Sequence, residues 1–276
     1  MVEVRHWSRS DTASLLRVPT AKDDKYSRGV VAVRTGSADY PGAAVLGVEA
    51  AWRAGAGYVR FIGEGRAADA VIARRPETVA GADLGRTRVD AWVIGSGTDA
   101  EHRTAEEDLA LRGILHGSVA VVVDAGALDL VSEATAPMLL TPHAGEFARI
   151  CEQSSVRTKG DHASDAAQLA DALECTVLLK GATTVIAAPD GEVVSTASAP
   201  AWLATAGSGD VLAGVLGALA AANPQEPLAR VAAAGAWLHG YAAAIASDAL
   251  EGRPGHPIVA LDVAEALPTA IADLLS

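Results

Sequence analysis

Four segments in the first half of the chain are largely apolar, and each has the length of one β-strand. Glycine or aspartate follows each of them, and segments with a helical pattern at 42–54 and 99–115 separate them. Apolar strands that are joined by helices form parallel sheets covered on both faces. The sequence therefore predicts an α/β fold with a mostly parallel central sheet. The four strand segments are 29–35, 58–62, 91–94 and 119–123.

The second half of the chain continues this pattern in shorter pieces. Residues 176–180 form a further predicted strand, and 184–188 and 192–194 form a predicted hairpin around the turn Pro189-Asp190-Gly191. No internal repeat, low-complexity linker or shift in composition divides the chain. We therefore expect residues 1–276 to form a single domain. Further helices are predicted at 8–16, 163–173, 208–222, 227–246 and 260–275.

Composition narrows the classes of partner. With 276 residues, of which 50% are hydrophobic, the chain is long enough to bury a sizeable core. A formal net charge of −12 and the lack of a basic stripe argue against nucleic acid. No apolar run is long enough to cross a membrane, and Cys151 and Cys175 have neither metal-ligand nor disulfide spacing. We expect a soluble protein in the reducing cytoplasm.

The turn Gly207-Ser208-Gly209-Asp210 opens the predicted helix at 208–222. Glycines let a ligand approach the main-chain amides, Ser208 is a natural helix cap, and a helix N-terminus favours anions. A carboxylate at Asp210 is unfavourable beside a phosphate unless it accepts a proton from a hydroxyl that attacks a phosphoryl group. The alternative is a glycine turn with a capping aspartate.

Polar residues lie at the ends of two of these predicted strands, 119–123 and 176–180, and shortly after the apolar residues 138–140. Strand ends are where a doubly wound sheet binds its ligands. Asp124 is a candidate for metal or substrate binding, or for capping the next turn. His143 precedes a predicted helix and is a candidate anion donor, proton carrier or helix cap. Lys180, followed by the hydroxyls of Thr183 and Thr184, is a candidate phosphate ligand or a solvated charge.

One motif points to a different class of protein. The turn from Gly95 to Ala100 fits the loose dinucleotide fingerprint G-x-G-x-x-A and makes a nicotinamide-dependent dehydrogenase an alternative. That fingerprint usually opens its domain, whereas here strands with their own glycine turns precede it. A P-loop NTPase is disfavoured because G-x-x-x-x-G-K-[ST] does not occur.

Taken in order, the motifs resemble the ADP-dependent NAD(P)H-hydrate dehydratases of the ribokinase-like superfamily. Each motif is short, but together they span nearly the whole chain. The resemblance rests on segments 41–44, 53–57, 94–97, 123–128, 141–146, 180–186 and 207–214.

This resemblance implies a ribokinase-like fold and assigns roles to individual residues. Asp210 is implied as the catalytic residue that activates the hydroxyl of hydrated NADH or NADPH for phosphorylation by ADP or ATP. Phosphate then leaves and the nicotinamide double bond is restored, so the net reaction is that of a hydro-lyase. Mg²⁺ is expected to bridge the nucleotide phosphates, and no protein ligand for it is assigned. The implied substrate-binding residues are Ala43, Ala44, Gly97, His143 and Asp210. The implied nucleotide-binding residues are Lys180, Gly181, Ala182, Thr183, Thr184, Gly207, Ser208 and Gly209.

The chain departs from the family pattern at two places. Segment 198–202 replaces an asparagine-containing glycine segment, which leaves nucleotide contacts from that side open. Arg34 stands near small apolar positions of the family and either meets a substrate phosphate or packs at a surface. Many relatives carry a fused epimerase domain. We expect this protein to lack it, so that epimer repair needs another protein.

Three hypotheses remain open at this stage. The first is the hydrate dehydratase, acting on small molecules without a nucleic-acid or membrane partner, as a homo-oligomer and specifically a tetramer. The second is a kinase of the same superfamily for a vitamin precursor or sugar. The third is a dehydrogenase-like or non-catalytic nucleotide-binding module.

Overall fold

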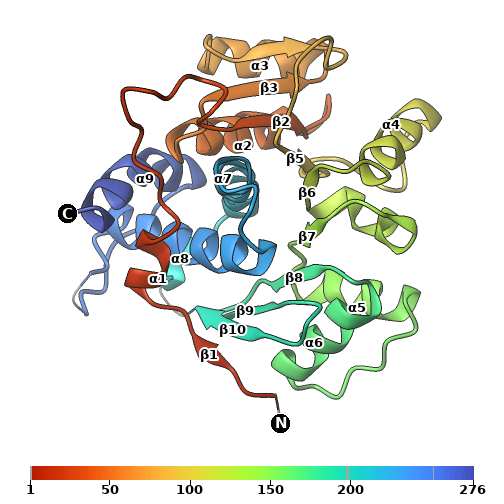
Figure 1. Ribbon diagram of the computed structural model, residues 1–276, viewed down its shortest axis with the longest axis vertical. Coiled ribbons are helices and arrows are strands. Elements are labelled where there is room, and N and C mark those ends of the chain that lie inside the picture. Colours follow the sequence, from red (N-terminus) through yellow and green to blue (C-terminus); the bar gives the residue numbers. More distant parts are fainter. Residues whose placement is uncertain (1, 197–198, 251) are drawn as a thin grey trace.

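A single sheet runs through the molecule in a computed structural model that describes residues 2–196, 199–250 and 252–276. Within these ranges it has ten strands in the order β1-β10-β9-β8-β7-β6-β5-β2-β3-β4 (Figure 1). Only β9 runs antiparallel to its neighbours, because it forms the expected hairpin with β10. The mostly parallel sheet is therefore confirmed. The strands are β1 (Arg5–His6), β2 (Val30–Arg34), β3 (Tyr58–Ile62), β4 (Val79–Gly81), β5 (Ala91–Ile94), β6 (Ala120–Val123), β7 (Met138–Leu140), β8 (Thr176–Leu179), β9 (Thr184–Ala187) and β10 (Val193–Thr196).

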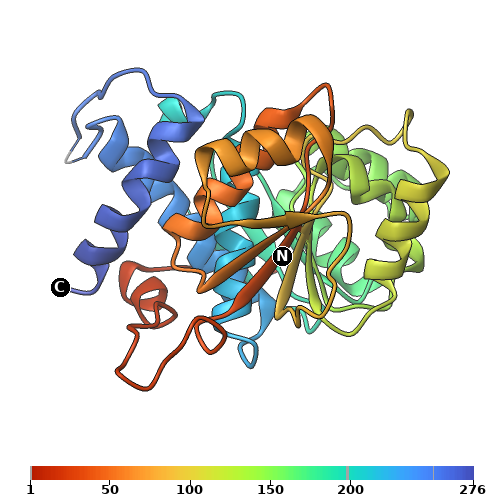
Figure 2. The same ribbon diagram turned by 90° about the horizontal axis from the view of Figure 1, so that it is seen from above.

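Helices cover both faces of this sheet (Figures 1 and 2). Successive residues of a strand point to opposite faces, and accordingly Val31 and Val33 join one buried cluster while Val30 and Ala32 join the other. The first cluster lies under α1 (Arg9–Ala13), α2 (Pro41–Arg53), α3 (Gly65–Arg74), α7 (Ser208–Ala222), α8 (Leu228–Ala246) and α9 (Ala260–Leu274). The second lies under α4 (Ala105–Leu115), the 3₁₀ segment η1 (Ala125–Glu133), α5 (Ala144–Gln153) and α6 (His162–Ala172).

Helix α7 lies against the middle of the sheet because its glycines permit close packing. A Cβ atom on Gly214 would lie 2.2 Å from the carbonyl oxygen of Gly47 in α2. One on Gly217 would lie 2.3 Å from a methyl group of Val93 in β5. Both distances are far below van der Waals contact. The glycines thus fix where the first turn of α7 sits above the sheet.

Several predicted boundaries differ from the structure. The helix predicted at 99–115 begins only at Ala105, because Thr104 caps it by accepting from the Glu107 amide at 3.1 Å. Asp99 instead accepts from the Glu101 amide at 2.9 Å within a turn. The N-terminal helix covers Arg9–Ala13 rather than 8–16. The helices predicted at 208–222, 227–246 and 260–275 are present within one residue at either end.

No helix in the described part of the chain has both the length and the apolar character needed to span a membrane. Cys151 and Cys175 are buried free thiols, as expected from their spacing.

Candidate active site

Four neighbouring strands, β5 to β8, bring the residues that follow their C-terminal ends together around one buried carboxylate. Asp124 follows β6 and is only 3% exposed. It accepts hydrogen bonds from the hydroxyls of Ser96 at 2.9 Å and Thr141 at 2.8 Å, and from the Lys180 ammonium at 2.9 Å. Its side chain caps no helix, although its backbone precedes η1. Asp124 therefore holds Lys180 in a defined position at this edge of the sheet.

The start of α7 lies beside this ion pair. Gly207 precedes the helix in the left-handed region with φ of 86°, and a Cβ atom there would lie 2.5 Å from Leu46. Our expectation that Ser208 caps the helix is wrong, because Gly207 occupies the N-cap and Ser208 is the first helical residue. No side chain caps α7. The first turn can therefore offer amide N–H groups and the positive end of the helix dipole to an anion.

Asp210 lies in the first turn of α7, in the field of both partners of the buried ion pair. Burial and repulsion by Asp124 raise the pKa of Asp210 to about 6, and attraction to Lys180 opposes this shift. The Lys180 ammonium nitrogen lies 3.5 Å from the position of a Cβ atom on Gly209, so it adjoins the same turn. A carboxylate with this pKa suits proton abstraction near neutral pH.

A cavity of about 750 Å³, here named the α7 cavity, opens on one side of this turn. Thr183 and Gly207, which the resemblance assigns to the nucleotide, do not line it. Ser198 lies outside the described residues, but residues 199–201 of the divergent segment do line the cavity. The other assigned residues line it together: Lys180, Gly181, Ala182, Thr184, Ser208 and Gly209.

Sequence reasoning missed His239, which lines the α7 cavity from α8. Its side chain is 6% exposed, and its Nε2 atom has no hydrogen-bond partner among the described residues. Burial lowers the pKa of His239 to about 4, against a hydrogen bond to the Ser208 backbone, so the ring is neutral at pH 7. A single histidine in an alanine-rich helix gives no sequence signal that it lines a cavity.

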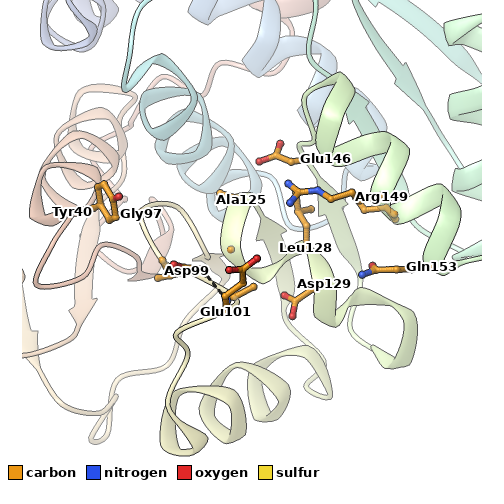
Figure 3. Close-up of a pocket in the computed structure, with 14 residues that line it drawn as sticks. Tyr40, Gly97, Asp99, Glu101, Ala125, Leu128, Asp129, Glu146, Arg149 and Gln153 are labelled. Carbon is orange, nitrogen blue, oxygen red and sulfur yellow. Dashed lines mark hydrogen bonds between the residues drawn. The ribbon is translucent and has the colours of Figure 1, made fainter.

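A second cavity, here named the β5 cavity, has a volume of about 520 Å³ (Figure 3). Gly97 lines it with φ of 67°, and a Cβ atom on Gly97 would lie 2.3 Å from the Cβ of Ala43. Ala44 adjoins Gly36 in the same way, at 2.8 Å. The structure thus brings the predicted residues Ala43, Ala44 and Gly97 together. The two alanines are buried next to the glycine loops, and neither lines the cavity.

The α5 N-terminus connects the two cavities. His143 caps α5 by accepting from the amides of Gly145 at 3.0 Å and Glu146 at 3.3 Å, so the capping interpretation of His143 is confirmed. His143 lines the α7 cavity, and Glu146 lines the β5 cavity. The Glu146 carboxylate lies 3.9 Å from the Lys180 ammonium. Two ligands, one in each cavity, would therefore approach each other near Lys180.

Two sequence features have structural explanations outside the reacting groups. The Arg34 guanidinium pairs with Glu107 of α4 through an Nε–Oε1 distance of 3.1 Å, which favours packing over phosphate binding. The glycine turn after β5 opens no helix, since α4 begins only at Ala105. It therefore lacks the helix N-terminus on which dinucleotide fingerprints depend.

Comparison with known proteins agrees with this geometry. The family model described as NAD(P)H-hydrate dehydratase matches residues 31–257. The bifunctional NAD(P)H-hydrate repair enzyme Nnr of Mycobacterium tuberculosis H37Rv is 44% identical over 229 residues, which is 80% of this chain and 47% of that protein. The chain thus spans about half the length of the bifunctional relatives it matches first.

A monofunctional relative and a solved structure match over most of their own length. The ADP-dependent (S)-NAD(P)H-hydrate dehydratase of Neisseria meningitidis serogroup B is 38% identical over 230 residues, covering 78% of this chain and 76% of the relative. The ADP/ATP-dependent NAD(P)H-hydrate dehydratase of Bacillus subtilis, crystallised with ATP and Mg²⁺, superimposes with a TM-score of 0.85 at 27% identity and covers 99% of both chains. This chain therefore belongs to the NAD(P)H-hydrate dehydratase family, with its ribokinase-like fold.

Proposed function

We propose that this protein is an ADP-dependent (S)-NAD(P)H-hydrate dehydratase, a hydro-lyase that returns hydrated NADH or NADPH to the reduced coenzyme. The observation that carries the proposal is the position of Asp210. Asp210 lines neither cavity, but its carboxylate has a pKa near 6 and lies in the field of Lys180, which lines the α7 cavity and lies 3.9 Å from Glu146 of the β5 cavity. A kinase-like step needs a base at the junction of a phosphate site and an alcohol site.

The α7 cavity is proposed to hold ADP or ATP. Lys180 and the amides of the first turn of α7 would bind the transferring phosphate, and Asp124 would keep the lysine in place. Gly181, Ala182 and Thr184 line the rest of the cavity. Thr183 and Gly207 are proposed to shape the loops around it, since neither lines the cavity.

The β5 cavity is proposed to hold the hydrated dinucleotide against Gly97, with Ala43 and Ala44 behind it and His143 at the connection between the cavities. Asp210 would take the proton of the substrate hydroxyl as its oxygen attacks the terminal phosphoryl group of ADP. The bond from that phosphorus to the AMP oxygen breaks, which leaves AMP and a phosphate ester. Inorganic phosphate then leaves while the neighbouring ring carbon loses a proton, and the electron pair of that C–H bond restores the nicotinamide double bond. ADP and the hydrate thus yield AMP, phosphate, NAD(P)H and a proton.

Magnesium fits this site as a cation carried by the nucleotide. Among the residues that the structure describes, no group of three or more His, Cys, Asp or Glu side chains could hold a metal ion alone. Mg²⁺ commonly binds one or two carboxylates together with phosphates and water, and Glu146 near Lys180 would serve as such a carboxylate. When bound, the cation neutralises charge on the phosphates.

Organisation and location are further parts of the proposal. The ten strands form one continuous sheet, which supports a single domain over residues 1–276. The exposed apolar side chains of Val259 and Leu275, at either end of α9, support subunit contacts, and a homo-tetramer is proposed. The buried free thiols support a reducing, cytoplasmic location. Sedimentation of the purified chain tests the tetramer.

The function is tested by recovery of the near-ultraviolet absorbance of NADH from purified (S)-NADH hydrate. Parallel samples receive ADP with Mg²⁺, ATP with Mg²⁺, or no nucleotide. The proposal expects nucleotide-dependent recovery with one AMP formed per NADH in the ADP sample. A small-molecule kinase would instead leave the hydrate unchanged, and hydride transfer without nucleotide would indicate a dehydrogenase.

A further inference from the structure

Arg149 projects from α5 into the β5 cavity, with its guanidinium directed between Ala125 and Glu146 (Figure 3). Arginines of this protein usually find an acidic or carbonyl partner, such as Glu107 for Arg34. Arg149 has neither a hydrogen bond nor an ion pair with any residue that the structure describes. Its charge is therefore available to a ligand in the cavity.

The acidic side chains around the cavity do not neutralise Arg149. Three of the four carboxylates in the lining are already paired with another base, and the exception is Glu101. The guanidinium can thus attract a phosphate bound in this cavity. The carboxylates can instead accept hydrogen bonds from sugar hydroxyls. The three pairs are Asp99–His102 at 2.6 Å, Asp129–Arg103 at 2.6 Å and Glu146–Lys180 at 3.9 Å.

The position of Arg149 along α5 indicates which phosphate of a bound dinucleotide it can reach. Glu146 lies beside Lys180, and Arg149 follows Glu146 by three residues on the same helix. Residues three apart on a helix are neighbours, with Cβ atoms about 5–6 Å apart. Arg149 therefore stands about one helical turn along α5 from Glu146, away from the N-terminal end that adjoins Lys180. In a dinucleotide whose nicotinamide end lies near Lys180, one ribose separates that end from the pyrophosphate, which places the pyrophosphate within reach of Arg149.

We propose that the Arg149 guanidinium binds the pyrophosphate of the hydrated dinucleotide and so fixes its position in the β5 cavity. This inference rests on the proposed function for the identity of the substrate. A planar guanidinium can donate two parallel hydrogen bonds to phosphate oxygens, which an ammonium cannot. Arg149 would act on substrate binding and leave the chemical step to Asp210.

The test compares Arg149→Gln with Arg157→Gln, a matched control that removes another exposed arginine without a partner in the described structure and outside the cavity. KM and kcat are measured with hydrated NADH, hydrated NADPH and hydrated reduced nicotinamide riboside, which has no phosphate. For Arg149→Gln we expect KM to rise about 10- to 100-fold for both dinucleotides, with kcat within threefold. KM for the riboside is expected to be unchanged. For the dinucleotides, the KM of Arg149→Lys should lie between those of the wild type and Arg149→Gln.

Three kinetic outcomes overturn the inference. An unchanged KM for the dinucleotides shows that Arg149 does not bind them. A rise confined to hydrated NADPH assigns Arg149 to the 2′-phosphate instead. A rise that includes the riboside shows general damage to the cavity.

Equilibrium titration with NADH, followed by its fluorescence, separates this inference from the proposed function. If the wild-type protein lacks dehydratase activity but binds NADH at least tenfold more tightly than Arg149→Gln, the function fails and the phosphate site stands. If the two proteins bind NADH equally, the phosphate site fails whether or not the enzyme is active.

Discussion

Replacing Asp210 by asparagine should abolish activity and at the same time stabilise the folded protein. Its carboxylate is largely buried and lies in the field of Asp124, and both effects disfavour the charged form. Asparagine has nearly the same shape and carries no charge. The substitution therefore removes the base that the reaction needs and the repulsion that the fold tolerates.

The magnitude follows from the pKa shift. The pKa of Asp210 rises from 3.8 to about 6, a shift of about two units, and each unit corresponds to about 1.4 kcal/mol between the two protonation states. Ionised Asp210 thus costs the fold up to about 3 kcal/mol. The cost is absent below pH 3.8, where the carboxyl group is protonated in both states. It grows as pH rises toward 6 and is constant above that value.

Urea unfolding at pH 4 and at pH 8 measures this difference, with the exposed Asp69→Asn as the control. We expect Asp210→Asn to exceed the wild type by about 2–3 kcal/mol at pH 8 and by less than 1 kcal/mol at pH 4. In the absorbance assay, kcat should fall by about 100- to 10,000-fold, because general-base catalysis contributes that range. Wild-type kcat should fall below pH 6 as Asp210 becomes protonated.

Two results would refute this reasoning. Equal stability of Asp210→Asn and wild type at pH 8 would mean that neither burial nor Asp124 disfavours the charged form of the carboxylate. A gain of the same size at pH 4 and pH 8 would mean that the effect comes from packing rather than charge. Asp69→Asn is expected to change stability by less than about 0.5 kcal/mol at either pH.

Two further substitutions test the scaffold of the site. Gly97→Ala should raise KM for the hydrate at least tenfold in the absorbance assay, because its Cβ would lie 2.3 Å from Ala43 at a φ of 67°; unchanged kinetics would contradict the placement of substrate there. Glu49→Gln should lower the free energy of unfolding by about 3 kcal/mol in urea at pH 7, because the side chain is 0% exposed and pairs with Arg53, Arg74 and Arg75. Burial raises the pKa of Glu49 but the arginines lower it further, so the difference should persist at pH 7 and shrink as pH falls below 4.5.

The sequence predicts the helices and strands that have a strong apolar periodicity. It does not predict elements that bury only a few side chains. Helix α7 is predicted at its observed bounds because every residue after the first turn is small or apolar. The segment between Ile62 and Ala91 received no prediction, yet it contains α3 and the edge strand β4. Only Ala67 and Val71 of α3 are buried, so its apolar periodicity is too sparse to detect.

The site shows the same division. The pattern of apolar strands is sufficient to predict that Asp124, His143 and Lys180 lie at strand ends on the ligand-binding side of the sheet. The pairing of Arg34 with Glu107 joins residues 73 positions apart and depends on where α4 packs. Arg149 was missed although it lies three residues after Glu146, because periodicity alone does not tell which cavity a helix face lines.

Asp124 links the two requirements of the proposed reaction. A phosphoryl site needs a fixed cation, and the proton step needs a carboxylate whose pKa lies near neutrality. Asp124 satisfies the first by accepting from Lys180 at 2.9 Å, and it contributes to the second because its repulsion adds to the burial that raises the pKa of Asp210. Two hydroxyl donors, Ser96 at 2.9 Å and Thr141 at 2.8 Å, also donate to the buried carboxylate of Asp124 and fix its position at the sheet edge. Replacing Asp124 by asparagine would therefore both loosen Lys180 and lower the pKa of Asp210. One buried charge thus determines the position of the lysine and contributes to the pKa of the base.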